Sequence, residues 1–285
     1  MNTRRSYLGH DIPGYTERLL KAISRYGLPP GASRAWVRDP DFQAWNSLGY
    51  MQPSGSIYWQ CYLNEALQAA GIDQLANLST ITILDKRWHF GERDWNFARG
   101  KIEYQVRRAL KGLNYLVMIE FEVFRNVRHL AAPRAGSLAA HEDHGRVIAP
   151  HIQGIIWGDA PSRRSRACFS GGILNAPAIK IVGVHDFAGA LRYMAKPPYR
   201  GRSVFRLTSG RCCRRPWAKM SLTLHHLLLS NLHQFCYPDL TFAGGEGRAV
   251  LADAKRLWRD YVPAATHPTD QRWPMYAGLV KRARG

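Results

Sequence analysis

The stretch that decides the fold is APHIQGIIWG, which occupies residues 149–158. Its centre alternates polar and apolar residues and then becomes fully apolar, as is typical of a buried β-strand. Alternate residues of a strand point to one face, so we expect His151 and Gln153 to lie side by side, with Gly154 allowing close backbone access beside them. An imidazole nitrogen and an amide oxygen placed in this way could supply two ligands of a divalent metal ion. The alternative is a strand that carries two polar residues on its solvent face.

The composition limits the class of protein. The chain has 285 residues, 46% of them hydrophobic, which is enough for a sizeable core and excludes a disordered protein. Lys and Arg number 40 against 21 Asp and Glu, and the net charge of +19 predicts a polyanionic partner, nucleic acid first of all. Because no apolar run has the length of a membrane span and no signal peptide is recognisable, we expect a cytoplasmic protein with no membrane partner. The five cysteines form no C-x-x-C motif and fit no standard zinc spacing, which favours reduced thiols.

A second strand is predicted at residues 115–124, with the sequence YLVMIEFEVF. Its alternation places Glu120 and Glu122 on the same face. Strands that follow one another in sequence are usually neighbours in a sheet, so either carboxylate could meet His151 and Gln153 across the ladder. A carboxylate, an imidazole and an amide oxygen together make a mixed site for Mg²⁺ or Mn²⁺.

A helix that starts at the N-cap residue Asp186 and ends at Pro197 carries a tyrosine and a lysine. Tyr193 and Lys196 are three residues apart, so they are expected to share one helix face. The phenol could act as a nucleophile on a phosphodiester and divide cleavage and rejoining into two exchanges. The lysine would hold the phosphate or stabilise the phenolate.

An acidic strand, a His-x-Gln strand and a Tyr-x-x-Lys helix thus follow one another along the chain. In this order they resemble the HUH endonucleases, and among these the single-tyrosine initiators of rolling-circle replication. The family's second motif, His-hydrophobic-His-Gly-hydrophobic, reads HIQGI here, with Gln153 in the place of the second His, as in some viral members. The family's Thr-rich first motif resembles residues 79–84 (STITIL), and its Tyr-x-x-Lys third motif falls on Tyr193 and Lys196.

The resemblance, which covers about residues 79–250, implies an activity. The protein would nick one DNA strand, form a 5′-phosphotyrosine and later rejoin the strand, and so initiate replication of a plasmid, a phage or an integrative element. The metal ligands would be His151, Gln153 and one of the two carboxylates, of which Glu120 matches the family's hydrophobic-Glu-hydrophobic pattern. The partner would be a single DNA strand or an origin hairpin. Since the chain has no G-x-x-x-x-G-K-[ST] phosphate loop, a separate host helicase would unwind the DNA for a host polymerase.

The fold class implied is α+β, with a central antiparallel sheet and packed helices as in RNA-recognition-motif-like domains. Around it we expect a helical N-terminal region at residues 1–75, to which the resemblance assigns no role. The nuclease domain with C-terminal helices is expected at residues 76–262, and an irregular basic tail at residues 263–285. The basic residues expected to contact DNA phosphates are Arg163, Arg164, Arg166, Arg200 and Arg202.

Two other functions remain open. A transposase or relaxase of the same superfamily would use the same tyrosine and metal and would differ in its DNA substrate. A non-catalytic nucleic-acid-binding module would account for the positive charge without an active site. Such a module would tolerate Tyr193→Phe, whereas a nuclease would not.

Overall fold

The computed structural model of the chain describes nine ranges of residues. These are residues 12–27, 53–91, 98–125, 127, 145–173, 176–196, 200–206, 212–214 and 218–261. The predicted tail at residues 263–285 lies outside these ranges.

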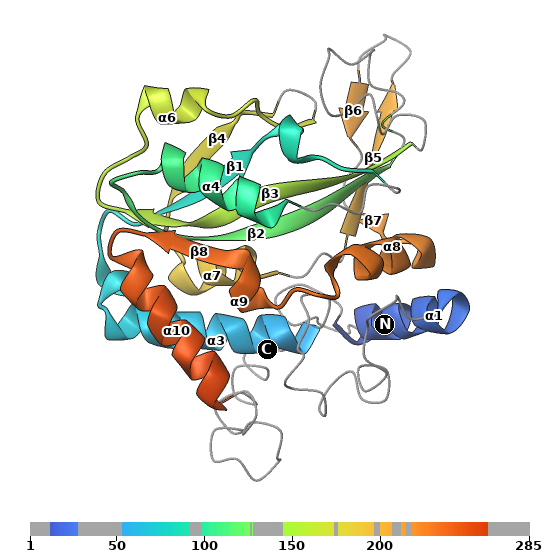
Figure 1. Cartoon of the computed structure of the whole chain (residues 1–285), viewed down its shortest axis with the longest axis horizontal. Coiled ribbons are helices and arrows are strands. Elements are labelled where there is room, and N and C mark those ends of the chain that lie inside the picture. Colours follow the sequence, from blue (N-terminus) through green and yellow to red (C-terminus); the bar gives the residue numbers. More distant parts are fainter. Residues whose placement is uncertain are drawn as a thin grey trace.

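The centre of the protein is a sheet built from β1 (Ser79–Leu84), β2 (Asn114–Arg125), β3 (Arg146–Trp157) and β4 (Ile179–Gly183). These strands lie in the order β4-β1-β3-β2, and each neighbouring pair is antiparallel (Figure 1). The strands predicted at the Thr-rich, acidic and His-x-Gln motifs are therefore confirmed, and the last two are direct neighbours.

Four shorter strands extend this sheet. β8 (Thr241–Gly244) pairs antiparallel with the beginning of β2, and β5 (Arg200–Arg206) pairs parallel with its end. β6 (Cys212–Arg214) and β7 (Ala218–Lys219) both pair antiparallel with β5. The protein is thus α+β, as expected, and its sheet is curled. The sheet is mixed and not purely antiparallel, because β5 adds a parallel pair that the sequence did not predict.

Helices cover both faces of the central strands (Figure 1). α4 (Arg99–Ala109) and α6 (Arg163–Ala167) contact each other on one side, while α7 (Phe187–Met194) contacts β2 and β3 on the other. α3 (Pro53–Ala69) lies beneath α7 in Figure 1 and contacts it, and α10 (Gly247–Tyr261) packs against α3 and also contacts β8 and β2. Further described elements are α1 (Ile12–Tyr26), η2 (Ile72–Gln74), η3 (Lys86–Trp88), α8 (Leu222–Leu232) and α9 (Tyr237–Leu240). Among the helices in the described ranges, none has the length and apolar character needed to cross a membrane.

The N-terminal helix α3 shares its core with elements near the C-terminus. Trp59 is fully buried, and its indole N–H donates a hydrogen bond to Oγ1 of Thr241 at 2.9 Å. Its ring also meets that of Trp258 edge-on, with 5.6 Å between the centroids. Because an aromatic side chain buries a large apolar area and Trp59 also satisfies its polar atom, these contacts fix α3 beneath the sheet.

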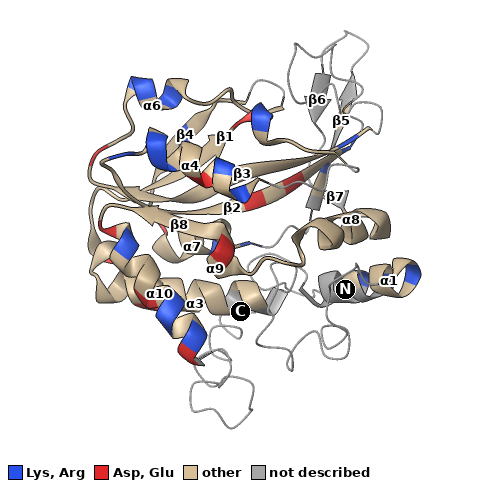
Figure 2. Cartoon of the chain, in the orientation of Figure 1, with Lys and Arg blue, Asp and Glu red and all other residues tan. Residues whose placement is uncertain are grey.

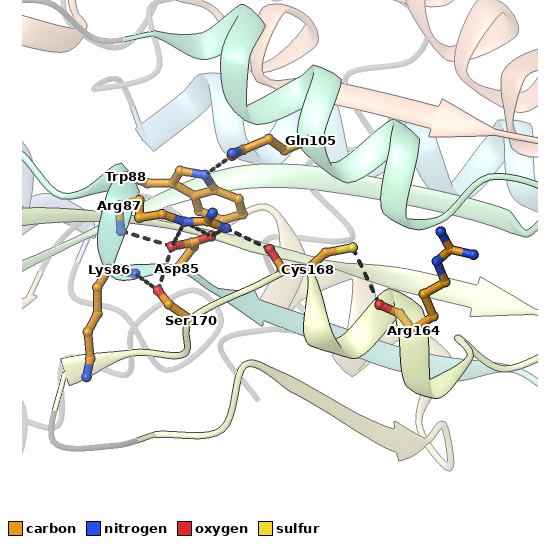
Figure 3. A network of polar contacts seen from close by, with 8 residues as sticks. All are labelled: Asp85, Lys86, Arg87, Trp88, Gln105, Arg164, Cys168 and Ser170. Carbon is orange, nitrogen blue, oxygen red and sulfur yellow. Dashed lines mark hydrogen bonds and ion pairs between the residues drawn. The ribbon is translucent and has the colours of Figure 1, made fainter. Parts of the chain in front are cut away.

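A buried carboxylate stands at the end of β1 (Figure 3). Asp85 is fully buried, forms an ion pair with Arg87 and accepts a hydrogen bond from Oγ of Ser170 at 2.7 Å. The guanidinium of Arg87 also donates to the carbonyl oxygen of Cys168, directly after α6, at 2.6 Å. The end of β1 is thereby tied to the end of α6.

The turn that follows β1, η3, also contacts α4. The indole N–H of Trp88 in η3 donates to the side-chain oxygen of Gln105 at 2.5 Å (Figure 3). The ring of Trp88 packs edge-on against Phe169, with 5.7 Å between the centroids. Together with the Asp85 contacts, this turn holds α4 and α6 in one arrangement.

We expect Asp85→Asn to lower the free energy of unfolding by about 2 kcal/mol at pH 7, the scale of hydrogen bonds to a charged group. Burial by itself raises the pKa of Asp85, but hydrogen bonds from Arg87 and Ser170 outweigh burial and hold the pKa below its ordinary 3.8. A carboxylate whose pKa is lower in the folded protein than in the unfolded protein stabilises the fold at pH values above its pKa in the unfolded protein. This stabilisation is lost as the pH falls through its pKa in the folded protein.

The difference between wild type and Asp85→Asn should therefore shrink as the pH falls below about 4. Urea unfolding of both proteins at neutral and acid pH measures it. A difference that stays constant over this range would contradict the assigned role of the carboxylate.

Candidate functional site

The candidate site is centred on Glu120 and His151, which face each other across the ladder between β2 and β3. Both side chains are buried, with 1% and 5% of their surface exposed. Nε2 of His151 lies 2.9 Å from Oε2 of Glu120. The strand pattern left open whether Glu120 or Glu122 lies next to the imidazole, and the strand register places Glu120 there. Burial of His151 and Gln153 also excludes the alternative in which both lie on a solvent face.

The second carboxylate, Glu122, has a different partner. Its register neighbour on β3 is Ala149, and its carboxylate forms an ion pair of 2.9 Å with Arg202 on β5. Arg202, which we expected at a DNA phosphate, is thus engaged with Glu122 in this structure. Arg200 also lies on β5, but its side chain lies outside the described part of the structure.

The segment at the end of α7 brings the predicted lysine to Glu120, and the predicted tyrosine contacts that lysine. Nζ of Lys196 lies 2.9 Å from Oε2 of Glu120 and 3.5 Å from the centroid of the Tyr193 ring. Burial by itself lowers the pKa of Lys196, but the negative charge of Glu120 outweighs burial and raises the pKa. The amine therefore stays a charged ammonium, and Tyr193 lies next to it with 51% of its surface exposed.

The position of Lys196 differs from the expected one in a detail. α7 ends at Met194, so Lys196 follows the helix instead of sharing its face, and its side chain turns back over the Tyr193 ring. The predicted cap is confirmed, because the side chain of Asp186 accepts a hydrogen bond from the backbone N–H of Gly189 at 2.8 Å. Leu191 and Met194 are buried in the main core cluster, which leaves Tyr193 on the outer side of the helix.

Gln153 is oriented by a residue that the sequence did not single out. Oγ1 of Thr82 on β1 donates a hydrogen bond of 2.9 Å to Oε1 of Gln153, its register partner on β3. A carbonyl oxygen has two lone pairs, so Oε1 keeps one for a further partner. The Thr-rich strand was expected from the resemblance, but the contact that gives Thr82 this role depends on the strand register.

Two residues of α3 hold the end of α7 in place. The hydroxyl of Ser56 donates a hydrogen bond to the carbonyl oxygen of Ala195, the residue before Lys196. The side-chain N–H of Gln60 in turn donates to Oγ of Ser56 at 2.9 Å, and both side chains are buried. Sequence reasoning missed this pair, because Ser56 and Ala195 are 139 residues apart in the chain.

The donor atoms of the site include a buried carboxylate oxygen that could bind a cation. Oε1 of Glu120 is buried and has no hydrogen-bond partner among the described residues, while Oε2 contacts His151 and Lys196. A buried carboxylate oxygen is costly unless a donor or a cation approaches it. Within the described ranges, no three His, Cys, Asp or Glu side chains lie close enough together to form a metal site. The predicted set differs from such a group, because it combines one carboxylate and one imidazole with the amide of Gln153. Carboxylate, imidazole and amide donors suit Mg²⁺ or Mn²⁺, so these residue types fit such an ion, and Oε1 is the oxygen of Glu120 without a protein partner in the described ranges.

The predicted DNA-binding arginines of α6 lie apart from this site. Arg163, Arg164 and Arg166 are exposed on α6, which lies on the α4 side of the sheet (Figures 1 and 2). Tyr193 is on α7, on the opposite side. A DNA strand at these arginines, as the sequence predicts, would therefore be separated from the phenol by the sheet.

Chemically, the site joins a half-exposed phenol to a buried ammonium, which in turn contacts a carboxylate paired with an imidazole. A phenol next to a fixed positive charge is suited to attack an electrophile whose own charge is negative, such as a phosphodiester. Comparisons of the chain with protein-family models, with curated proteins and with solved structures found no match.

Proposed function

We propose that the protein cleaves and rejoins single-stranded DNA through a 5′-phosphotyrosine on Tyr193, as a rolling-circle replication initiator of the HUH kind. The observation that carries this proposal is the meeting of Glu120, His151, Lys196 and Tyr193, which come from two neighbouring strands and from the end of one helix. The sequence resemblance predicts these same residues in these roles.

The arrangement of the central strands supports a core like that of RNA-recognition-motif domains. Along the chain the elements follow as β1, α4, β2, β3, α6 and β4, and in the sheet the strands lie in the order β4-β1-β3-β2. This is the connectivity of the split β-α-β-β-α-β arrangement. With α4 and α6 on one face, the other face is left to α7 and the proposed nucleophile (Figure 1).

In the proposed reaction the phenolic oxygen of Tyr193 forms a bond to phosphorus, and the bond from phosphorus to the 3′ oxygen of the preceding nucleotide breaks. The phenol loses its proton and the 3′ oxygen gains one. A phenol has an unperturbed pKa of about 10, so it is a weak nucleophile at neutral pH unless its negative charge is stabilised. The ammonium of Lys196 lies over the Tyr193 ring and supplies that stabilisation. The reverse reaction closes the strand.

Glu120, His151 and Gln153 would hold the metal ion. When bound, a divalent ion polarises a phosphodiester oxygen and offsets the charge that develops on it. The free 3′-OH would prime a host polymerase, with a separate host helicase to unwind the template.

The proposal is tested by incubating the protein with Mn²⁺ and a pool of single-stranded oligonucleotides, followed by a denaturing gel. We expect a covalent adduct that carries a 3′-end label and not a 5′-end label, because the enzyme stays on the 5′ phosphate of the downstream piece. Treatment with EDTA should abolish the adduct. Binding of the pool without any adduct would show a non-catalytic DNA-binding protein, whereas a relaxase or transposase would form the same adduct on a different DNA.

The two carboxylates provide a matched pair of variants. We expect Glu120→Gln to slow adduct formation by about 10²-fold or more, because it removes the charge that faces His151 and Lys196. Glu122→Gln should stay near the wild-type rate, since its partner is Arg202. Single-turnover rates measure both, with the urea unfolding midpoint as a check that each variant is folded. Equal rates for the two folded variants would remove Glu120 from the site.

A further inference from the structure

The side of α4 that faces away from the sheet carries a basic stripe with a tyrosine at its centre. Lys101, Tyr104, Arg108 and Lys111 are all exposed, Tyr104 to 64%. Spacings of three and four residues place Lys101, Tyr104 and Arg108 on one side of α4, and Lys111 follows in the turn after the helix. The side chains that α4 buries are Ile102, Val106 and Ala109.

Neighbouring residues add positive charge to this stripe. α6 contacts α4 and contributes three exposed arginines, Arg163, Arg164 and Arg166 (Figure 2). The α4–α6 surface is defined here as these three arginines together with Lys101, Tyr104, Arg108 and Lys111. α6 has no acidic residue, and the single acid of α4, Glu103, forms ion pairs with Arg99 and Arg107 outside this surface. Its positive charge is therefore not offset by an acid on either helix.

The two helices are held in a fixed relation. The turn after β1 donates a hydrogen bond from Trp88 to Gln105 on α4 and another from Arg87 to the carbonyl oxygen of Cys168 after α6 (Figure 3). The α4–α6 surface is thus arranged before any ligand arrives, which lowers the entropy cost of binding.

We propose that the α4–α6 surface binds single-stranded DNA, at a place distinct from the strand at Tyr193. A basic stripe of about 10 Å along α4, from the seven residues between Lys101 and Arg108 at helical rise, continues to Lys111 and can contact consecutive phosphates. The exposed ring of Tyr104 offers a platform for an unpaired base, which a duplex does not present. An amphipathic helix for a membrane surface would need several exposed apolar side chains, whereas the aliphatic side chains of α4 are buried and Tyr104 is its one exposed large hydrophobic residue. This binding is separate from the proposed reaction and needs no chemistry at Tyr193.

The test measures the anisotropy of a labelled oligo-dT strand against protein concentration, in a Tyr193→Phe background so that no cleavage interferes. We expect the triple variant Lys101→Gln/Arg108→Gln/Lys111→Gln to bind about tenfold more weakly, with the log–log salt slope reduced by about 2 for three lost phosphate contacts. The matched control, Arg248→Gln/Arg256→Gln/Arg259→Gln on α10, removes the same charge and should keep the affinity and slope. Equal losses of DNA affinity in the two triple variants would show that only the net charge of the protein matters, and would overturn the proposal.

Variants of Tyr104 distinguish between the possible ligands of the α4–α6 surface. Tyr104→Ala should weaken oligo-dT binding about tenfold, whereas Tyr104→Phe should bind like its parent, because stacking needs the ring and not the hydroxyl. A Tyr104→Ala variant with unchanged affinity, or a triple variant that loses duplex but not single-stranded DNA, would contradict the single-strand assignment. A triple variant that loses binding to anionic phospholipid vesicles and keeps DNA binding would assign the surface to a membrane. Failure of the nicking proposal would be seen separately, as absent adduct with intact DNA binding.

Discussion

Tyr193→Phe is expected to bind single-stranded DNA with the affinity of the wild type and to form no covalent adduct. The substitution removes only the hydroxyl that would bond to phosphorus. The ring remains beneath Nζ of Lys196, so the ion pair between Lys196 and Glu120 should be kept. Because half of the Tyr193 surface is exposed, loss of its hydroxyl leaves the core intact. A denaturing gel for the adduct and anisotropy for binding measure the two quantities on the same preparation.

Tyr199 provides the control for this variant. It follows Tyr193 by six residues, lies outside the described part of the structure and is the nearest rival nucleophile in the sequence. We expect Tyr199→Phe to form the adduct at the wild-type rate, and peptide mapping of the wild-type adduct to place the nucleotide on Tyr193. An adduct that maps to Tyr199, or that persists in Tyr193→Phe, would contradict the assignment and favour a reaction that uses two tyrosines.

The strands of the site could be predicted from the sequence because their patterns are strong. The run STITIL forms β1 at the predicted residues, and the acidic strand and the His151 strand are neighbours, as expected. The strand pattern alone could not predict which carboxylate meets the imidazole, since Glu120 and Glu122 share a face, although the resemblance favoured Glu120. That choice depends on the strand register, and a slip of two residues would exchange the two while keeping every apolar residue on its side.

The contacts that support the site could not be predicted, because they join distant parts of the chain. Ser56 reaches the residue before Lys196 from a helix that carries no motif, and Arg202 reaches Glu122 through a parallel strand pair. Local patterns report the period of an element and its exposed face, but not which side chain of another element lies opposite. Local patterns likewise could not predict that the sheet separates the α6 arginines from Tyr193, because that depends on how distant elements pack.

Gly154→Ala is expected to lower the free energy of unfolding by about 3 kcal/mol, at the upper end of overpacking effects. The sequence suggested that Gly154 gives close backbone access beside the site, and the structure shows that the backbone coming close is that of β2. A Cβ atom on Gly154 would lie 2.3 Å from the carbonyl oxygen of Leu116 and 2.6 Å from Cα of Val117. These are backbone atoms of a central strand, so they cannot move aside without opening the ladder between β2 and β3.

Gly183→Ala is the matched control for this substitution. Gly183 is also a strand glycine, but it is exposed at the end of β4, and a Cβ atom there would have no neighbour within 4 Å. Its free energy of unfolding should stay within about 0.5 kcal/mol of the wild type, since exposed substitutions away from special contacts have small effects. Urea unfolding with a common m-value measures both variants. If Gly154→Ala unfolded at the wild-type midpoint, β2 and β3 could not approach each other as closely as described, and the pairing of Glu120 with His151 that depends on this approach would be wrong.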